Sequence, residues 1–249
     1  MNDGSDPTES PAYPLRAREA PTIADLDALV VECRACPRLV AWREEVAVVK
    51  RAAFRAETYW ARPVPGFGAE HARVMVVGLA PAAHGANRTG RMFTGDRSGD
   101  FLFAALSRTD FASQPTSTHR GDGLTLDGAR LTAPVRCAPP ENKPTPLERR
   151  TCGPWLGREL ELVVPRVIVV LGGFGWQALL ATLTEQGWRV PRPRPVFAHG
   201  AELRLSGLGD RELTVLGCFH VSQQNTFTGR LTGPMLDSVL ARARAVAAE

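Results

Sequence analysis

Apolar runs with β-sheet character alternate with amphipathic stretches along most of this chain. The runs cover residues 73–79, 129–137, 165–173 and 211–220, and helical spacing covers residues 23–32, 44–57, 98–108, 147–163, 174–186 and 233–249. Strands that alternate with helices form βαβ units, whose parallel strands are buried under helices on both faces. The pattern predicts an α/β fold with a mainly parallel sheet. Thr22 and Ser98 are the expected N-caps of the helices that follow them.

The length and composition of the chain fit one domain. The 249 residues are 44% hydrophobic, which is enough to bury a core. Residues 1–21 are polar and Pro-rich and carry no secretory signal, so we expect a disordered tail before a single domain over residues 22–249. No apolar run reaches the roughly eighteen residues of a membrane span. We therefore expect a cytoplasmic monomer without a membrane segment.

The charge of the chain is compatible with a polyanionic partner. The formal net charge is +4, and a basic surface attracts nucleic acid. Only Lys50 and Lys143 of the thirty basic residues are lysines. The excess of arginine can equally reflect a general compositional bias, so charge alone does not decide the partner.

Three polar loops leave the carboxyl ends of predicted strands, over residues 80–97, 138–146 and 219–232. Ligands bind at this edge of an open parallel sheet, so the loops are expected to converge on one site. The first loop belongs to the Gly-rich stretch GLAPAAHGANRTGRMFTGD. It lacks the lysine of a Walker A loop and the G-x-G-x-x-G of a dinucleotide site. The remaining alternatives are a binding wall of another kind or a surface loop with incidental glycines.

The other two loops present polar side chains. Asn142 lies in the proline-stiffened segment RCAPPENKPTP. Its amide offers one acceptor and two donors, which suit the imide edge of a base such as uracil, although an ordinary exposed turn residue would have the same sequence. His220 follows a strand directly and precedes the polar run SQQN. It is either a recognition residue or a hydrogen-bonded structural histidine.

Four of the five cysteines form a candidate metal site. Cys33 and Cys36 form a C-x-x-C pair, and Cys137 and Cys152 follow far along the chain. In a cytosolic protein this arrangement favours metal binding over disulfides. The spacing allows either a [4Fe–4S] cluster or a Cys₄ zinc site. Cys218 lies on a predicted buried strand and is expected in the core.

The three loops and the four cysteines together resemble the family-5 (type B) uracil-DNA glycosylases, iron–sulfur members of the uracil-DNA glycosylase superfamily. The resemblance extends from about residue 25 to residue 245. It implies a three-layer α/β/α sandwich around a four-stranded, mainly parallel sheet, with a [4Fe–4S] cluster on Cys33, Cys36, Cys137 and Cys152. It also implies monofunctional hydrolysis of the N-glycosidic bond of uracil and related deaminated or damaged bases in DNA, after base flipping.

The resemblance also implies roles for single residues. Asp96 would assist at the sugar, His220 would donate a hydrogen bond to the departing base, and Asn142 would take part in catalysis and read the base edge. The expected substrate contacts are Ala80, Ala82, His84, Asn87, Phe93 and Asn142. The expected DNA contacts are Ser222, Gln223, Gln224, Asn225, Thr228, Gly229 and Arg230.

One departure from the superfamily keeps two other functions open. Related families carry a polar, water-activating side chain just after the first strand, where this chain has Ala80, Ala82 and Ala83. The small side chains would leave a roomy pocket. Their lack of a polar group also suits an iron–sulfur DNA-binding protein without excision activity. A zinc-stabilised hydrolase of free nucleotides is the third possibility.

Overall fold

The computed structural model describes residues 6–207, 209 and 211–249, and they build one six-stranded sheet in the order β1-β3-β2-β4-β6-β5. The strands are β1 (Phe67–Gly68), β2 (Val74–Val77), β3 (Ala129–Thr132), β4 (Val167–Leu171), β5 (Glu202–Ser206) and β6 (Glu212–Cys218). The four apolar runs supply the central strands, which are parallel. The expected count of four strands is wrong, because β1 and β5 add an antiparallel strand at each edge.

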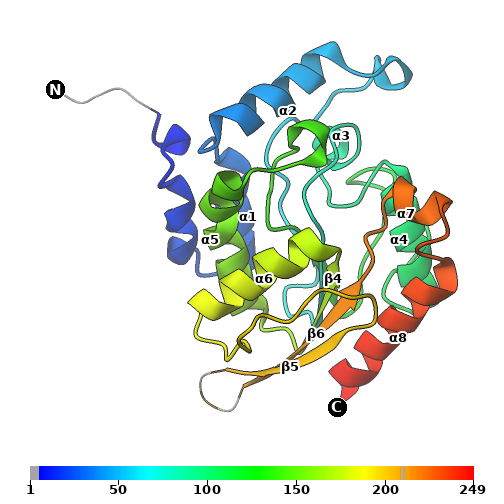
Figure 1. Ribbon diagram of the computed structural model, residues 1–249. Coiled ribbons are helices and arrows are strands. Elements are labelled where there is room, and N and C mark those ends of the chain that lie inside the picture. Colours follow the sequence, from blue (N-terminus) through cyan, green and yellow to red (C-terminus); the bar gives the residue numbers. More distant parts are fainter. Residues whose placement is uncertain (1–5, 208, 210) are drawn as a thin grey trace.

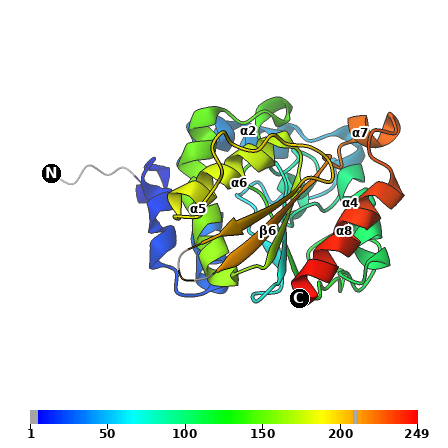
Figure 2. The ribbon, with the colours of Figure 1, turned by 60° about the horizontal axis from the view of Figure 1, so that its bottom comes forward.

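Helices cover both faces of the sheet and complete a three-layer α/β/α sandwich, as predicted (Figures 1 and 2). Successive strand residues point to opposite faces. Val74 and Val76 therefore join a core with α4 and α8, whereas Met75 and Val77 join a second core with α1, α5 and α6. The long helices are α1 (Ile23–Glu32), α2 (Pro37–Val49), α4 (Arg97–Arg108), α5 (Pro146–Val163), α6 (Gly173–Glu185) and α8 (Gly233–Ala248).

Two helices begin at other residues than their sequences suggested. α2 begins at Pro37, directly after Cys36, and ends at Val49 rather than extending over 44–57. Proline is well suited to the first position of a helix, because the missing N–H has no partner there. The N-cap of α4 is Asp96 and not Ser98. Thr22 caps α1 as expected, since its side chain accepts a hydrogen bond from the Asp25 amide.

The segment before α1 is folded where the structure describes it, which corrects the expected disorder. The 3₁₀ helices η1 (Pro7–Glu9) and η2 (Tyr13–Glu19) precede α1, and Tyr13 and Ala17 are buried. Arg158 of α5 donates two hydrogen bonds to the Ala20 carbonyl oxygen. Burial of Tyr13 beside Trp155 compensates the ordering of this segment. Residues 1–5 of the expected tail lie outside the described residues. In the part of the chain that is described, no helix has the length and apolar character needed to cross a membrane.

Candidate active site at the carboxyl edge of the sheet

The loops after β2, β4 and β6 meet at one point of the sheet edge, at glycine positions. A β-carbon at Gly175, in the first turn of α6, would lie 2.7 Å from the Gly78 carbonyl oxygen. A β-carbon at Gly172 would lie 3.2 Å from that of His220, and the φ of +91° at Gly172 favours glycine. The glycines therefore serve close backbone approach, which is what brings the first and third loops together.

Phe93 is held in a strained conformation by two glycines. Its φ of +53° is unusual for a residue with a bulky side chain. A β-carbon at Gly78 would lie 2.5 Å from the edge of the Phe93 ring, and one at Gly99 would overlap the Phe93 carbonyl oxygen. Such strain costs about 1–3 kcal/mol and concentrates at functional sites. The ring is half-buried at the carboxyl end of β2.

Asp96 combines a structural hydrogen bond with a constrained second oxygen. One carboxylate oxygen accepts a hydrogen bond of 2.9 Å from the Gly99 amide nitrogen and caps α4. The other lies where a β-carbon at Gly85 would be, so only glycine fits there. Burial raises the pKa of Asp96 above its ordinary value, and the amides of Gly99 and Ser98 oppose that rise. The result is an acidic group in a fixed position, half-buried beside the loop.

Two arginines fasten the loop between β2 and α4. Arg88 donates to the carbonyl oxygens of His84 and Gly95, both at 2.8 Å, and pairs with Glu57. Arg91 is buried and reaches Asp122 with both terminal nitrogens, at 2.8 and 2.5 Å. This pairing lowers the pKa of Asp122. A long loop thus acquires a single shape from charged hydrogen bonds rather than from regular structure.

His84 and Asn87 occupy different environments within this loop. His84 is half-buried, and its Nδ1 shares a hydrogen bond of 2.9 Å with the hydroxyl of buried Tyr59. Burial and the charge of Arg51 lower its pKa. Asn87 is fully buried, and its amide donates to the backbone carbonyls of Arg43 and Ala83. Its Oδ1 has no partner among the described residues, so the substrate contact expected of Asn87 stays a prediction.

His220 is held in a desolvated position at the end of β6. Burial lowers its pKa to about 4, so the imidazole is neutral near pH 7. Asn225 donates a hydrogen bond of 2.8 Å to the His220 carbonyl oxygen. The predicted DNA contact Asn225 therefore also fixes the backbone at His220. A neutral imidazole in this place can donate one N–H to a ligand.

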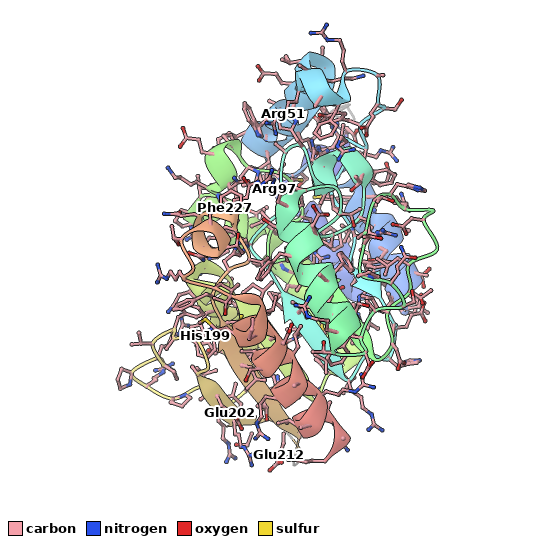
Figure 3. The ribbon with its side chains drawn as sticks, turned by 90° about the vertical axis from the view of Figure 1, so that its right-hand side faces the viewer. Arg51, Arg97, His199, Glu202, Glu212 and Phe227 are labelled. Carbon is pink, nitrogen blue, oxygen red and sulfur yellow. The ribbon has the colours of Figure 1, made fainter. Side chains whose placement is uncertain are left out.

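The segment after His220 forms a short exposed helix, α7 (Gln223–Phe227). Among the predicted DNA contacts, Gln223, Gln224, Thr228, Gly229 and Arg230 are exposed, whereas Ser222 and Asn225 are half-buried. Phe227 is 66% exposed at the end of α7, and the Arg97 guanidinium lies 5.4 Å from the centre of its ring. Figure 3 shows both on the same side of the molecule. An exposed large aromatic beside a cation suits contact with nucleic acid.

The remaining predicted contacts lie on the second loop and after β2. Asn142 is exposed, with a φ of +57°, and its side chain has no hydrogen bond to the part of the chain described. It follows Pro140 in the 3₁₀ helix η4 (Pro140–Asn142). Ala80 packs against an apolar cluster that contains Cys137, and Ala82 is half-buried. The structure brings Phe93, Asp96 and His220 to one edge and leaves Asn142 free to contact a ligand.

The four cysteines of the candidate metal site line one cavity. Its lining includes Cys33, Cys36, Cys137 and Cys152, together with Arg136 and Trp155. Burial raises the pKa of Cys36 to about 12 and that of Cys137 to about 11. Within the described residues, no three or more His, Cys, Asp or Glu side chains are close enough to hold a metal ion. Cys218 lies in the core of the sheet, as expected.

Comparison with known sequences now decides the family. The profile described as "Uracil DNA glycosylase superfamily" matches residues 65–244. The chain belongs to the uracil-DNA glycosylase superfamily. A type-5 uracil-DNA glycosylase of Mycobacterium tuberculosis (strain CDC 1551 / Oshkosh) is 56% identical over 92% of this chain and 83% of its own length. Those of Thermus thermophilus and Pyrobaculum aerophilum are 54% and 44% identical, over 86% and 87% of this chain and 94% and 89% of their lengths.

Several residues around this superfamily site gave no sequence signal. Tyr59 contacts the first loop from a separate segment, and Arg88 and Arg91 are arginines of the loop itself. Phe227 is an aromatic residue within a run that is otherwise polar. The scarcity of aromatic residues, 7% of the chain, was the one available signal for Phe227. The arginines could not be identified in a chain where arginine is abundant.

Proposed function

We propose that this protein is a monofunctional uracil-DNA glycosylase that hydrolyses the N-glycosidic bond of uracil and related deaminated or damaged bases in DNA. The proposal rests on the convergence of Phe93, Asp96 and His220 at one sheet edge, in a chain of this superfamily. Relatives named type-5 uracil-DNA glycosylase support the activity. The target base must leave the helix, because its glycosidic bond is inaccessible in the stack.

Asp96 and His220 would act on opposite sides of the breaking bond. Cleavage develops positive charge on the deoxyribose and negative charge on the departing base. The Asp96 carboxylate is held in place by the Gly99 amide, so it can stabilise the sugar cation or orient a water molecule without first reorganising. Neutral His220 would donate a hydrogen bond to the base oxygen as its charge grows. The lysine beside the proposed site, Lys143, is exposed, and its ammonium pairs with Glu141 at 3.0 Å. An amine held in this way suits hydrolysis by water better than attack by lysine.

The base and the DNA would be held by residues around this pair. Phe93 offers a ring for stacking, and Asn142 is exposed and free to hydrogen-bond the base edge. The α7 segment with Arg230 would contact the phosphates, and Phe227 would occupy the space that the extruded base leaves. Cations at Arg97 and Arg230 favour salt-sensitive DNA binding.

The cysteine cavity would hold a [4Fe–4S] cluster on Cys33, Cys36, Cys137 and Cys152. All four are free thiols that line one cavity, and buried guanidinium nitrogens without acceptors lie beside it. A zinc ion needs four sulfurs within about 2.3 Å of one centre, whereas a four-iron cluster accepts ligands that stand farther apart. When bound, the cluster would supply iron–thiolate bonds that join the end of α1, the start of α2, the second turn of α5 and the segment after β3. Its role in hydrolysis is structural.

The test is excision on a panel of oligonucleotides that contain uracil, hypoxanthine or ethenocytosine. Alkali-sensitive breaks at uracil, without a borohydride-trapped covalent adduct, are the expected result. Salt-dependent binding with no abasic product on any substrate would instead support a DNA-binding protein without excision. Iron analysis and the visible spectrum of the purified protein test the cluster separately from the activity.

A further inference from the structure

Two arginines are buried beside the cysteine cavity, and neither has a full set of hydrogen-bond acceptors. Arg43 of α2 is 1% exposed and Arg136, next to Cys137, is 2% exposed. Nε of Arg43 and both Nε and Nη1 of Arg136 have no partner among the described residues. Buried N–H groups are almost always bonded in native proteins, so donors of this kind indicate an occupant that is not part of the polypeptide.

Arg43 lacks a buried counter-charge. Its Nη1 donates to the Cys33 carbonyl oxygen at 3.3 Å and to the Cys137 sulfur at 2.9 Å. Glu44 approaches Arg43 only to 4.0 Å, and this half-exposed carboxylate already binds Arg34. A buried guanidinium that faces a neutral thiol and a carbonyl is poorly compensated. It would be compensated by negative charge on the sulfur atoms.

Arg136 has a different balance of charge. Its Nη2 pairs with Glu159, a fully buried carboxylate that also binds Arg130 and Thr132. Asp27 supplies a second carboxylate to Arg130, so the two acids balance the two arginines. The Arg136 amide donates to the Cys152 sulfur at 3.4 Å. Arg136 therefore offers the cavity free N–H donors but little uncompensated charge.

We propose that Arg43 and Arg136 donate hydrogen bonds to the thiolate and sulfide sulfur atoms of the cluster and set its redox stability. This inference rests on the iron–sulfur cluster of the proposed function, not on the excision activity. Four thiolates around a four-iron core carry net negative charge, and their sulfur atoms accept hydrogen bonds. The two arginines would supply the charge and the donors that this buried anion needs.

The direction of the effect follows from electrostatics. Hydrogen bonds and positive charge near the sulfurs stabilise the more electron-rich state, which raises the reduction potential and opposes oxidation of the cluster. Arg43 should have the larger influence because its charge is unbalanced, whereas that of Arg136 is shared with Glu159. Both act as positioning residues, since neither lies among the substrate-contacting side chains.

The test compares iron-loaded wild type with Arg43→Gln, Arg136→Gln and Arg43→Lys. Voltammetry should show a negative shift of the midpoint potential in both glutamine variants, larger for Arg43, and ferricyanide should bleach their visible absorbance several-fold faster. Arg43→Lys keeps the charge and should recover part of the potential. The matched control is Arg34→Gln, because Arg34 lies between Cys33 and Cys36 but points to Glu44 and Glu9.

The outcomes separate this inference from the proposed function. Wild-type potential and bleaching rate in Arg43→Gln and Arg136→Gln, with full iron content, would overturn it. If Arg43→Gln does not fold, wild-type potential and bleaching rate in Arg136→Gln would overturn the role of Arg136, and Arg43→Met would replace Arg43→Gln in the test of Arg43. A potential shift of the same size in Arg34→Gln would show that any nearby positive charge sets the potential, and would overturn the specific role of Arg43 and Arg136. If purified wild-type protein contains no iron, both the proposed cluster and this inference are overturned. Uracil excision is measured independently and tests the proposed activity.

Discussion

Buried arginines occur both in the loop between β2 and α4 and at the cavity of the cysteines. They differ in whether their guanidinium nitrogens have hydrogen-bond acceptors. Arg91 in the loop has acceptors for its guanidinium in Asp122, Ser117 and Thr94. Arg43 and Arg136 at the cavity keep nitrogens that no described residue accepts. The polypeptide satisfies the buried arginine of the loop, whereas the two arginines of the cavity would be satisfied only with an occupant. We therefore expect the proposed base site to keep its shape in iron-free protein, provided that the cysteine cavity does not collapse.

The largest expected effect comes from a substitution in the loop that leaves the cysteine cavity unchanged. Asp96→Asn keeps an efficient N-cap for α4 but removes the carboxylate charge. We expect uracil excision to fall roughly 100- to 10,000-fold, with DNA affinity and iron content unchanged. Single-turnover assays measure excision, and gel shifts measure DNA affinity. Asp100→Asn, one turn along the same helix and exposed, is the control. Equal loss of binding and excision would remove Asp96 from the catalytic role.

The second prediction breaks the satisfied arginine of the loop. Arg91→Met leaves Asp122 as a buried, unpaired carboxylate, so the free energy of unfolding should drop by about 3–5 kcal/mol, with or without iron. Urea unfolding measures it. Arg108→Met breaks an ion pair with Asp237 at the surface, where the expected loss is about 0–1 kcal/mol.

The effect of Arg43→Met on stability should be opposite to that of Arg91→Met, and it should depend on whether iron is bound. In iron-free protein, removing an uncompensated buried charge should leave stability unchanged or increase it. In iron-loaded protein the same variant should be destabilised, because the cluster then supplies the counter-charge. Chemical unfolding before and after iron removal gives both values. Equal destabilisation in the two forms would contradict the difference drawn between loop and cavity.

Phe227 tests the surface contribution to DNA binding. Phe227→Ala removes an exposed ring that is proposed to stack in the gap left by the base, so binding should weaken by about 1–3 kcal/mol. The measurement uses uracil-containing duplex and the Asp96→Asn background, which prevents turnover. Val196→Ala, 85% exposed on another part of the surface, is the control. An unchanged Kd would exclude Phe227 from the interface.

The last prediction concerns the pH dependence of stability, and near pH 7 its effect is the smallest. The pKa of His220 is about 4 in the folded protein and about 6.5 when unfolded, so the unfolded state takes up the proton first. Stability should fall as the pH drops from about 6.5 to 4, by at most about 1.4 kcal/mol per pH unit from this group. His220→Gln should remove that part of the slope in urea unfolding at pH 7 and pH 5. Exposed His71→Gln is the matched control, and an identical slope in wild type and His220→Gln would show that His220 is not desolvated.

Much of this architecture follows from the sequence alone. The apolar runs determined the four parallel strands, because only strands buried on both faces are apolar throughout. Their order along the chain determined which loops lie at the carboxyl edge, and the cysteine spacing indicated a metal site. The sequence does not predict the edge strands, because β1 has only two residues and β5 is largely exposed.

Only the tertiary structure decided what individual polar residues do. Asp96 became the helix cap, Asn87 turned into the interior, and Arg43 came to lie 2.9 Å from the Cys137 sulfur, ninety-four positions away in the chain. A local pattern reports which faces of an element are apolar. It does not report which distant groups accept a buried hydrogen bond. That depends on packing between segments, and packing decides where donors are left without partners.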